Sequence, residues 1–257
     1  MKFVSNTAYD QIADWYDAWV SSLGLDDDPV FASVERLMGG VDGLRICEIG
    51  TGQGRVARRL VEHGASVVGV DSSLRMLEIA RGYLPSEAVA GGPSSVHQIE
   101  YRLADACTLD GFADADFDGV LAYMSLMDIE ELEPTLHSVY RVLRPGGWFV
   151  FAILHPCYNT ARSGELLIPD GLVRTTGQYF VEGHWRSDLR TGPPGKVGLY
   201  HRMLSTYLNA LLKVGFTLAQ FAEPSATGSL AERRPIWSEV PNALVVLCTK
   251  PAPHMDA

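Results

Sequence analysis

The stretch Arg45-Ile46-Cys47-Glu48-Ile49-Gly50-Thr51-Gly52-Gln53-Gly54-Arg55-Val56-Ala57 decides the fold of this 257-residue chain. Its apolar residues predict a buried strand over 45–49, followed by a turn with glycines at alternate positions. Apolar residues then recur at helical spacing from Val56 to Val61. A strand, a glycine-rich turn and a helix in this order predict a cradle for a nucleotide-like ligand at the carboxyl edge of a parallel sheet.

Strands and helices alternate through most of the remaining chain. Apolar runs predict six further strands, at residues 66–70, 97–103, 117–122, 148–154, 216–221 and 243–248. Helices are expected at 6–22 and 29–38 before the cradle, and Asp128 is expected to cap the helix before the fifth strand. This order predicts an α/β fold, a Rossmann-like, mostly parallel sheet of seven strands with helices on both faces.

The pattern lapses for about fifty residues after His155. Only residues 178–185 look like a strand there, and an uncovered loop of that length is usually functional or disordered. We therefore expect one domain over 1–257. It comprises a helical cap (1–40), a ligand-binding core (41–155), a substrate-covering insertion (156–203), and a last helix with two strands (204–250).

Composition argues against several classes of protein. The net charge of −10 and the lack of a dense run of Lys or Arg disfavour a nucleic-acid partner. The longest apolar run, 148–154, is far shorter than the roughly 20 residues that a membrane span needs, and residues 1–20 contain no signal-peptide core. The four cysteines form no CxxC pair, so neither a disulfide framework nor a zinc site is indicated. A soluble cytoplasmic protein is expected.

The glycine turn itself narrows the ligand. A dinucleotide-binding turn reads G-x-G-x-x-G, whereas here the third glycine, Gly54, comes one position early and Arg55 takes its place. An acidic residue, Glu48, precedes the turn, which favours a ligand carrying positive charge over a phosphate. S-adenosylmethionine, with a sulfonium, an ammonium and no phosphate, fits better than NAD.

Several motifs together resemble one family. EIGTGQG (48–54), VVGVD (67–71), ADA (104–106) and RVLRPGGWFVF (141–151) resemble, in order and spacing, the motifs of class I S-adenosylmethionine-dependent methyltransferases. YDQIADWYD (9–17) is similar to the start of many small-molecule members. The resemblance implies the same fold, with last strands at 216–223 and 242–249, one of them antiparallel.

The resemblance also implies roles for individual residues in holding the cofactor. The turn backbone would pass the methionine moiety, Glu48 would orient its ammonium, Asp71 with Ser72 would bind the ribose hydroxyls, and Asp105 with the Ala106 backbone would bind the adenine. The implied cofactor site comprises Tyr16, Glu48, Gly50, Thr51, Gly52, Gly54, Asp71, Ser72, Met76, Asp105, Ala106, Tyr123 and Met124. From the residues alone, Asp71 and Asp105 could also be turn acids, and Met76 ordinary core.

The acceptor side is less determined. His155 ends the fifth strand and is the candidate general base, although such a histidine is as often structural. Aromatic and histidine residues are expected to cover a small organic acceptor: Tyr9, Tyr158, Tyr179, His184, Trp185 and His201. A metal site at His155, Cys157 and His184 has no supporting spacing, and none is expected.

The predicted function is methyl transfer from S-adenosylmethionine to an oxygen, nitrogen or carbon of a small metabolite, as in specialised metabolism, with S-adenosylhomocysteine as product. The protein is expected to act as a monomer or homodimer. Two alternatives stay open: a non-catalytic S-adenosylmethionine-binding regulatory partner, and an NAD(P)-dependent oxidoreductase.

Overall fold

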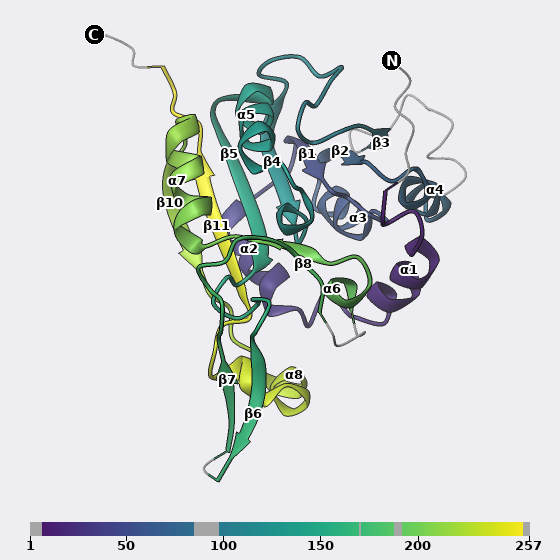
Figure 1. Cartoon of the computed structure of the whole chain (residues 1–257). Coiled ribbons are helices and arrows are strands. Elements are labelled where there is room, and N and C mark those ends of the chain that lie inside the picture. The colour runs from purple at the N-terminus through teal and green to yellow at the C-terminus, as the bar shows by residue number, and fades with distance from the viewer. Residues whose placement is uncertain (1–6, 85–97, 170, 188–191, 254–257) are drawn as a thin grey trace.

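The computed structural model describes residues 7–84, 98–169, 171–187 and 192–253. A seven-stranded sheet forms its centre, in the order β10-β11-β5-β4-β1-β2-β3 (Figure 1). The strands are β1 (Arg45–Ile49), β2 (Ser66–Asp71), β3 (Ile99–Leu103), β4 (Phe117–Tyr123), β5 (Leu143–Leu154), β10 (Thr217–Ala222) and β11 (Ala243–Thr249). The pairs among β1 to β5 are parallel, and β11 runs antiparallel to both β5 and β10. The predicted fold class is confirmed, including the single antiparallel strand.

Helices cover both faces of the sheet. On one face, α5 (Leu132–Val142) and α7 (Leu204–Val214) pack over a core that includes Phe149 and Phe151. On the other face, the helices α2 (Pro29–Met38), α3 (Arg55–Glu62) and α4 (Leu74–Gly82) pack over Ile46 and Val150. Because helices cover both faces of the sheet, the central strands are continuous apolar runs and not alternating apolar and polar residues.

The helix predicted at 29–38 is confirmed as α2. Its cap is the Asp28 carboxylate, which accepts a hydrogen bond from the Val30 N–H at 2.9 Å. The helix predicted at 6–22 is wrong in its first half, since α1 covers only Ala13–Ser21. Before it, the Asp10 carboxylate accepts from the Thr7 N–H at 2.8 Å. Such a local bond competes with the helical pattern and keeps residues 7–12 in turns.

Two further boundaries differ from the prediction. Asp128 does not cap α5; it ends a short 3-10 helix, η2 (Leu126–Asp128), and α5 begins only at Leu132. The fifth strand begins at Leu143 rather than 148. The strand predicted at 97–103 is described from Ile99 onward, and His97 lies outside the described residues.

The insertion after β5 is more ordered than predicted. It contains a hairpin of β6 (Gly164–Ile168) and β7 (Gly171–Thr175), which projects from the sheet in Figure 1. A second pair, β8 (Gly183–Trp185) with β9 (Leu199–His201), lies beside the short helix α6 (Pro193–Lys196). After β10, α8 (Gly228–Arg233) and η3 (Pro235–Ser238) precede the last strand.

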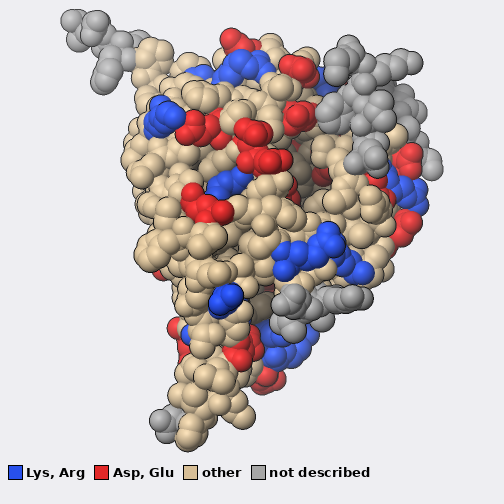
Figure 2. Space-filling model, in the orientation of Figure 1, with Lys and Arg blue, Asp and Glu red and all other residues tan. Residues whose placement is uncertain are grey.

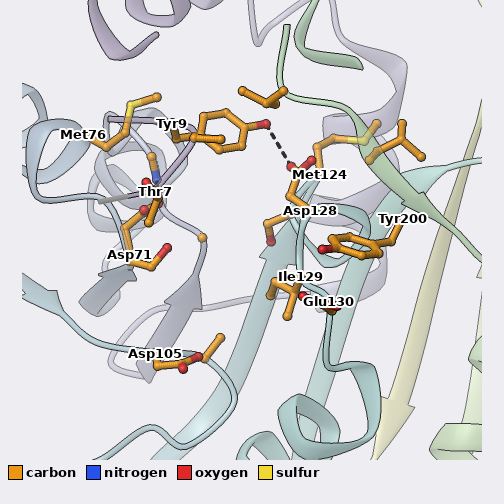
Figure 3. A pocket seen from close by; sticks show the side chains of 18 of the residues that line it. Thr7, Tyr9, Asp71, Met76, Asp105, Met124, Asp128, Ile129, Glu130 and Tyr200 are labelled. Carbon is orange, nitrogen blue, oxygen red and sulfur yellow. Dashed lines mark hydrogen bonds between the residues drawn. The ribbon is translucent and has the colours of Figure 1, made fainter. Parts of the chain in front are cut away.

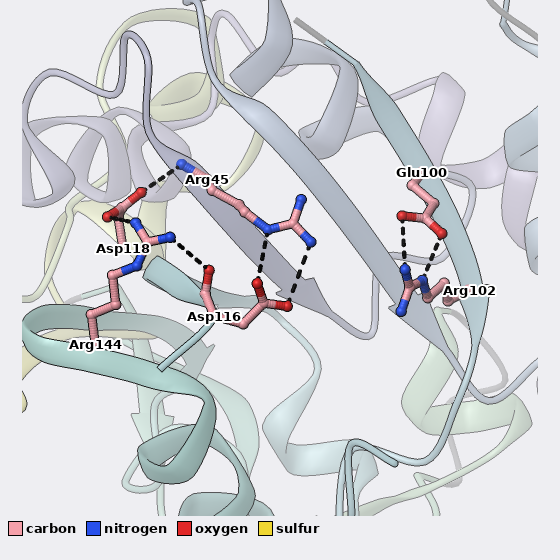
Figure 4. A network of polar contacts seen from close by, with 6 residues as sticks. All are labelled: Arg45, Glu100, Arg102, Asp116, Asp118 and Arg144. Atoms are coloured by element: carbon pink, nitrogen blue, oxygen red, sulfur yellow. Dashed lines mark hydrogen bonds and ion pairs between the residues drawn. The ribbon is translucent and has the colours of Figure 1, made fainter. Parts of the chain in front are cut away.

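The amino ends of the central strands are tied together by charges (Figure 4). The Asp118 carboxylate accepts from the Arg45 N–H at 2.8 Å and also binds the Arg144 guanidinium. Asp116 pairs with Arg45 at 3.3 Å, and farther along β3 Arg102 binds Glu100 at 2.6 Å. The contacts of Arg45, Asp116, Asp118 and Arg144 lie at or near the start of β1, β4 and β5, so they fix the edge of the sheet opposite the glycine turn.

Gly119 in β4 leaves room for the side chain of Trp148 on the neighbouring strand β5. A Cβ on Gly119 would lie 2.2 Å from Cζ2 of Trp148 on β5. We predict that Gly119→Ala lowers the free energy of unfolding by about 1–3 kcal/mol, as overpacking of a core does. Urea denaturation measures this. The matched control is Gly40→Ala, where a Cβ meets nothing within 4 Å; equal losses in both variants would contradict the packing explanation.

Candidate active site

A cavity of about 480 Å³ lies at the carboxyl ends of β1, β2, β3 and β4. Figure 3 shows Asp71 and Met76 on one side of it, Asp105 below, and Asp128, Glu130 and Tyr200 on the opposite side. Most of the predicted site residues line this cavity: Tyr9, Tyr16, Gly50, Gly52, Asp71, Ser72, Met76, Asp105, Ala106, Tyr123, Met124 and His184. The sheet edge predicted to carry the ligand is therefore the hollow one.

The glycines of the turn are required by backbone shape and by close neighbours. Gly50, Gly52 and Gly54 all have positive φ, between 55° and 76°. A Cβ on Gly50 would lie 2.4 Å from the Ser125 Cβ, and one on Gly54 would lie 2.0 Å from the Tyr101 Oη. Gly50 and Gly52 form part of the cavity wall, whereas Gly54 lies behind it and lets α3 start close to β3.

Asp71 joins the turn to the end of β2. Its carboxylate accepts from the Gly52 N–H and from the Ser73 N–H, both at 2.8 Å. Burial raises the pKa of Asp71, while these two bonds oppose that rise. A carboxylate held in this way by backbone still has lone pairs free to accept hydroxyl groups from within the cavity.

Met76 and Asp105 line the cavity on either side of Asp71, as Figure 3 shows. Asp105 follows β3, and its carboxylate accepts from the Cys107 N–H at 2.8 Å, which fixes the loop in a turn. Met76 belongs to the first turn of α4, whose N-cap Ser73 accepts from the Met76 N–H at 3.1 Å. Neither residue is merely a turn or core residue, because both also line the cavity.

Neither Glu48, near the end of β1, nor Thr51, within the turn, lines the cavity. Glu48 is only 2% exposed, and its carboxylate accepts from the Thr51 hydroxyl at 2.5 Å. Burial raises the pKa of Glu48 to about 7, and the nearby Asp71 adds to this. Its position supports the turn from below, and a direct contact with a bound ammonium stays a prediction.

The N-terminal segment closes the cavity from above. Tyr9 and Tyr16 line it and meet edge to face at 5.6 Å. The Ser73 hydroxyl donates to the Asp10 carboxylate at 2.6 Å. Arg55, which stands where a dinucleotide turn needs glycine, donates to the carbonyls of Val20 at 2.9 Å and Leu23 at 3.2 Å. The guanidinium therefore anchors this segment instead of facing a phosphate.

His155 lies outside the cavity. Its Nδ1 accepts from the Cys157 N–H at 3.1 Å, so Nε2 carries the proton and donates to Glu223 at 3.0 Å. Burial lowers the pKa of His155. With both ring nitrogens engaged away from the cavity, this geometry does not favour its predicted role as base.

Most of the residues of the insertion that were expected to cover the acceptor contact other parts of the protein instead of the cavity. The Tyr158 ring stacks under the Arg174 guanidinium at 3.8 Å inside the insertion, and Tyr179 Oη accepts from the Leu204 N–H at 3.0 Å. The His201 ring faces the carbonyls of Asn159 and Tyr179. Like His155, these three residues and Trp185 are absent from the cavity lining, where His184 alone of the predicted insertion residues is present.

Several lining residues were not predicted. Asp128, Glu130 and Glu131 bring carboxylates, and Thr7, Ser125 and Tyr200 add hydroxyls. For the residues between 125 and 131, the sequence offers one signal, their position just after the fourth strand. Asp128 and the apolar residues after it also have the pattern of a capped helix, and this pattern does not indicate exposure to the cavity.

The lining is acidic. Asp71, Asp105, Asp128, Glu130 and Glu131 face it, and none of its described residues is Lys or Arg. Figure 2 shows acidic side chains beside the hollow on this face. A pyrophosphate would meet these carboxylates with no cationic side chain to offset them in the described lining, whereas a ligand with a sulfonium and an ammonium is attracted. The residues present therefore fit S-adenosylmethionine and disfavour a dinucleotide.

Among the described residues, no cluster of His, Cys, Asp and Glu has the arrangement to hold a metal ion. No helix in that part of the chain is long and apolar enough to cross a membrane.

Comparisons with known proteins agree with this site. Residues 47–151 match the family model described as "Methyltransferase domain". A solved S-adenosylmethionine-dependent methyltransferase from Mesorhizobium loti superposes with a TM-score of 0.74 at 31% identity, covering 88% of this chain and 100% of that one.

Two curated fungal relatives are O-methyltransferases. O-methyltransferase rstn1 of Aspergillus nomiae is 32% identical over 56% of this chain and 71% of its own length. O-methyltransferase cnsE of Penicillium expansum is 34% identical over 49% of this chain and 46% of its own length. The chain thus spans about half of the second relative.

The chain belongs to the family of S-adenosylmethionine-dependent methyltransferases. Its cofactor is S-adenosylmethionine, and the oxidoreductase alternative is not favoured.

The buried Glu48 gives a test of how the turn is stabilised. Its pKa rises from 4.5 to about 7 on folding, so the folded state holds its proton more tightly. The stabilisation is present below pH 4.5 and is lost as the pH rises through 7; at about 1.4 kcal/mol per unit it amounts to at most about 3 kcal/mol. We predict that Glu48→Gln is more stable relative to wild type at pH 8 than at pH 5.

Urea denaturation at pH 5, 6, 7 and 8 measures this difference. Glu232→Gln, on an exposed position of α8, is the control and should leave the pH dependence unchanged. Parallel stability curves for wild type and Glu48→Gln would show that Glu48 titrates normally in the folded protein.

Proposed function

We propose that this protein transfers a methyl group from S-adenosylmethionine to a hydroxyl group of a small organic acceptor. The observation that carries the proposal is the acidic cavity at the carboxyl edge of the sheet. Asp71 and Asp105 follow or end the adjacent strands β2 and β3 there, and the glycine turn joins β1 to α3 at the same edge. S-adenosylmethionine supplies an electrophilic methyl group on a good leaving group, so much of the catalysis is positioning and exclusion of water.

The chain's own residues divide the cavity into two parts. The side that holds Asp71, Met76 and Asp105 would bind the cofactor, with Asp71 accepting both ribose hydroxyls and Asp105 accepting the adenine amino group. The opposite side, lined by Tyr9, His184, Leu199 and Tyr200, is left for the acceptor. It is small and partly aromatic, which suits a single organic molecule rather than a polymer.

Oxygen is favoured as the methylated atom because both relatives above are named O-methyltransferases. A non-catalytic cofactor-binding partner would need only the cofactor side. The acceptor side, with two tyrosine hydroxyls and the half-buried Asp128 carboxylate, favours an enzyme.

Asp71 tests the cofactor half. We predict that Asp71→Asn weakens S-adenosylmethionine binding by roughly 10- to 100-fold, because hydrogen bonds to a charged acceptor contribute about 1.5–3 kcal/mol. Isothermal calorimetry measures this, with circular dichroism to confirm that the variant is folded. Asp110→Asn, on the exposed surface after β3, is the matched control. Unchanged affinity in Asp71→Asn, or binding of NADH by wild type, contradicts the assignment.

The acidic lining predicts which acceptors are preferred. With methyl-labelled S-adenosylmethionine, uncharged catechol should be methylated at least about tenfold more efficiently than the anionic 3,4-dihydroxybenzoate, because the carboxylate is repelled by Glu130 and Glu131. Glu130→Gln with Glu131→Gln should narrow the difference. A preference for the anion would contradict the proposed charge of the acceptor.

A further inference from the structure

Asp128 is an acid that the cofactor does not need. It ends η2 directly after β4, on the side of the cavity opposite Asp71 (Figure 3). Its carboxylate accepts from the Tyr9 hydroxyl at 3.0 Å. The contact joins residues that are 119 positions apart in the chain.

The carboxylate is held in place from behind. The Arg202 guanidinium, 8% exposed, donates to the carbonyls of Leu126 at 3.3 Å, Ile129 at 2.6 Å and Glu130 at 2.7 Å. The cation is therefore bound to backbone on both sides of Asp128, and no Lys or Arg among the described residues forms an ion pair with the Asp128 carboxylate. On the other side, Tyr9 is fixed against Tyr16.

Burial raises the pKa of Asp128 to about 7, and Asp71 adds to the rise while Tyr9 opposes it. The other titratable or charged groups that act on Asp128 or lie near it are Tyr16, Tyr207, Arg202 and Glu130. A carboxylate that is unpaired by a cation and titrates near neutrality is suited to accept a proton from a bound molecule.

We infer that Asp128 is the catalytic proton acceptor for the hydroxyl group that receives the methyl, and that Tyr9 is the positioning residue that aims its carboxylate. This rests on the proposed function. In the step, the acceptor oxygen forms a bond to the methyl carbon while the bond from that carbon to sulfur breaks. The electron pair of the broken bond stays on sulfur as a neutral thioether, and the hydroxyl proton moves to the Asp128 carboxylate, from which water removes it after product release.

Other groups in the lining are less suited to this step. Glu130 and His184 are exposed to water, and the His184 Nε2 faces the Val197 carbonyl at 3.2 Å. Asp71 and Asp105 are engaged by backbone N–H groups on the cofactor side. Asp128 alone among the lining acids of the described chain combines a half-buried carboxylate with a place on the acceptor side.

Turnover with catechol and methyl-labelled S-adenosylmethionine tests the inference. We expect Asp128→Asn to lower kcat/KM by roughly 10²- to 10⁴-fold. Wild-type kcat/KM should fall on the acid side of pH 7, where Asp128 takes up a proton. Tyr9→Phe should move this acid limb to higher pH, because the hydroxyl no longer stabilises the carboxylate. A purely structural Tyr9 would not move the limb.

Calorimetry tests the same carboxylate without turnover. A carboxylate beside the reacting methyl group attracts the cationic S-adenosylmethionine but not the neutral S-adenosylhomocysteine. The ratio of the affinity for S-adenosylmethionine to that for S-adenosylhomocysteine should fall at least about threefold from pH 8 to pH 5.5, both in wild type and in the control Asp110→Asn. In Asp128→Asn this change should be at least halved, because of the two carboxyl groups whose pKa lies near 7 only Glu48, which does not line the cavity, still titrates.

The outcomes separate this inference from the proposed function. If wild type binds S-adenosylmethionine and Asp128→Asn keeps both turnover within threefold and the full wild-type pH dependence of the preference for the cationic cofactor, only the role of Asp128 is overturned. If catechol is not methylated, the calorimetric comparison decides the role of Asp128. If wild type binds no S-adenosylmethionine, the proposed function itself fails.

Discussion

The structure depends on one carboxylate, that of Asp71, which connects two neighbouring strands at the edge where the cavity opens. By accepting the N–H groups of Gly52 and Ser73 it holds the turn after β1 against the start of α4. The turn can adopt its left-handed backbone only because its residues are glycines, and Ser125 and Tyr101 occupy the space where side chains would be. The same bonds that shape the turn leave the carboxylate facing the cavity, so the fold and the cofactor site share a single feature.

The order of the strands and the acids at their carboxyl ends could be predicted from the sequence. Asp71 and Asp105 could be predicted because parallel strands end at a common edge, and an acid at the end of a strand must then lie near the glycine turn. The apolar runs located the strands themselves, including both strands after the insertion. These inferences need only the period of the apolar residues and the direction of the chain.

Residues whose placement depends on distant contacts could not be predicted in this way. Asp128 precedes an amphipathic helix and has the local pattern of a cap, and only the Tyr9 hydroxyl and the Arg202 guanidinium reveal its other position. His155 ends a strand on the predicted edge, yet its ring turns toward Glu223 on the segment after β10. In the insertion, Arg174 of β7 likewise packs over the ring of Tyr158, which precedes the hairpin. No periodicity in that segment indicates this contact.

The buried acids in and beneath the cavity have a consequence for stability. Burial raises the pKa of Glu48, Asp71 and Asp128 alike, so near neutral pH the empty protein holds its carboxylates at a cost in free energy. A bound sulfonium offsets part of this cost, whereas the thioether of the spent cofactor carries no charge with which to do so. Since a ligand that binds only the folded state stabilises it by mass action, the charged cofactor should raise the stability of the folded protein more than the same concentration of spent cofactor does.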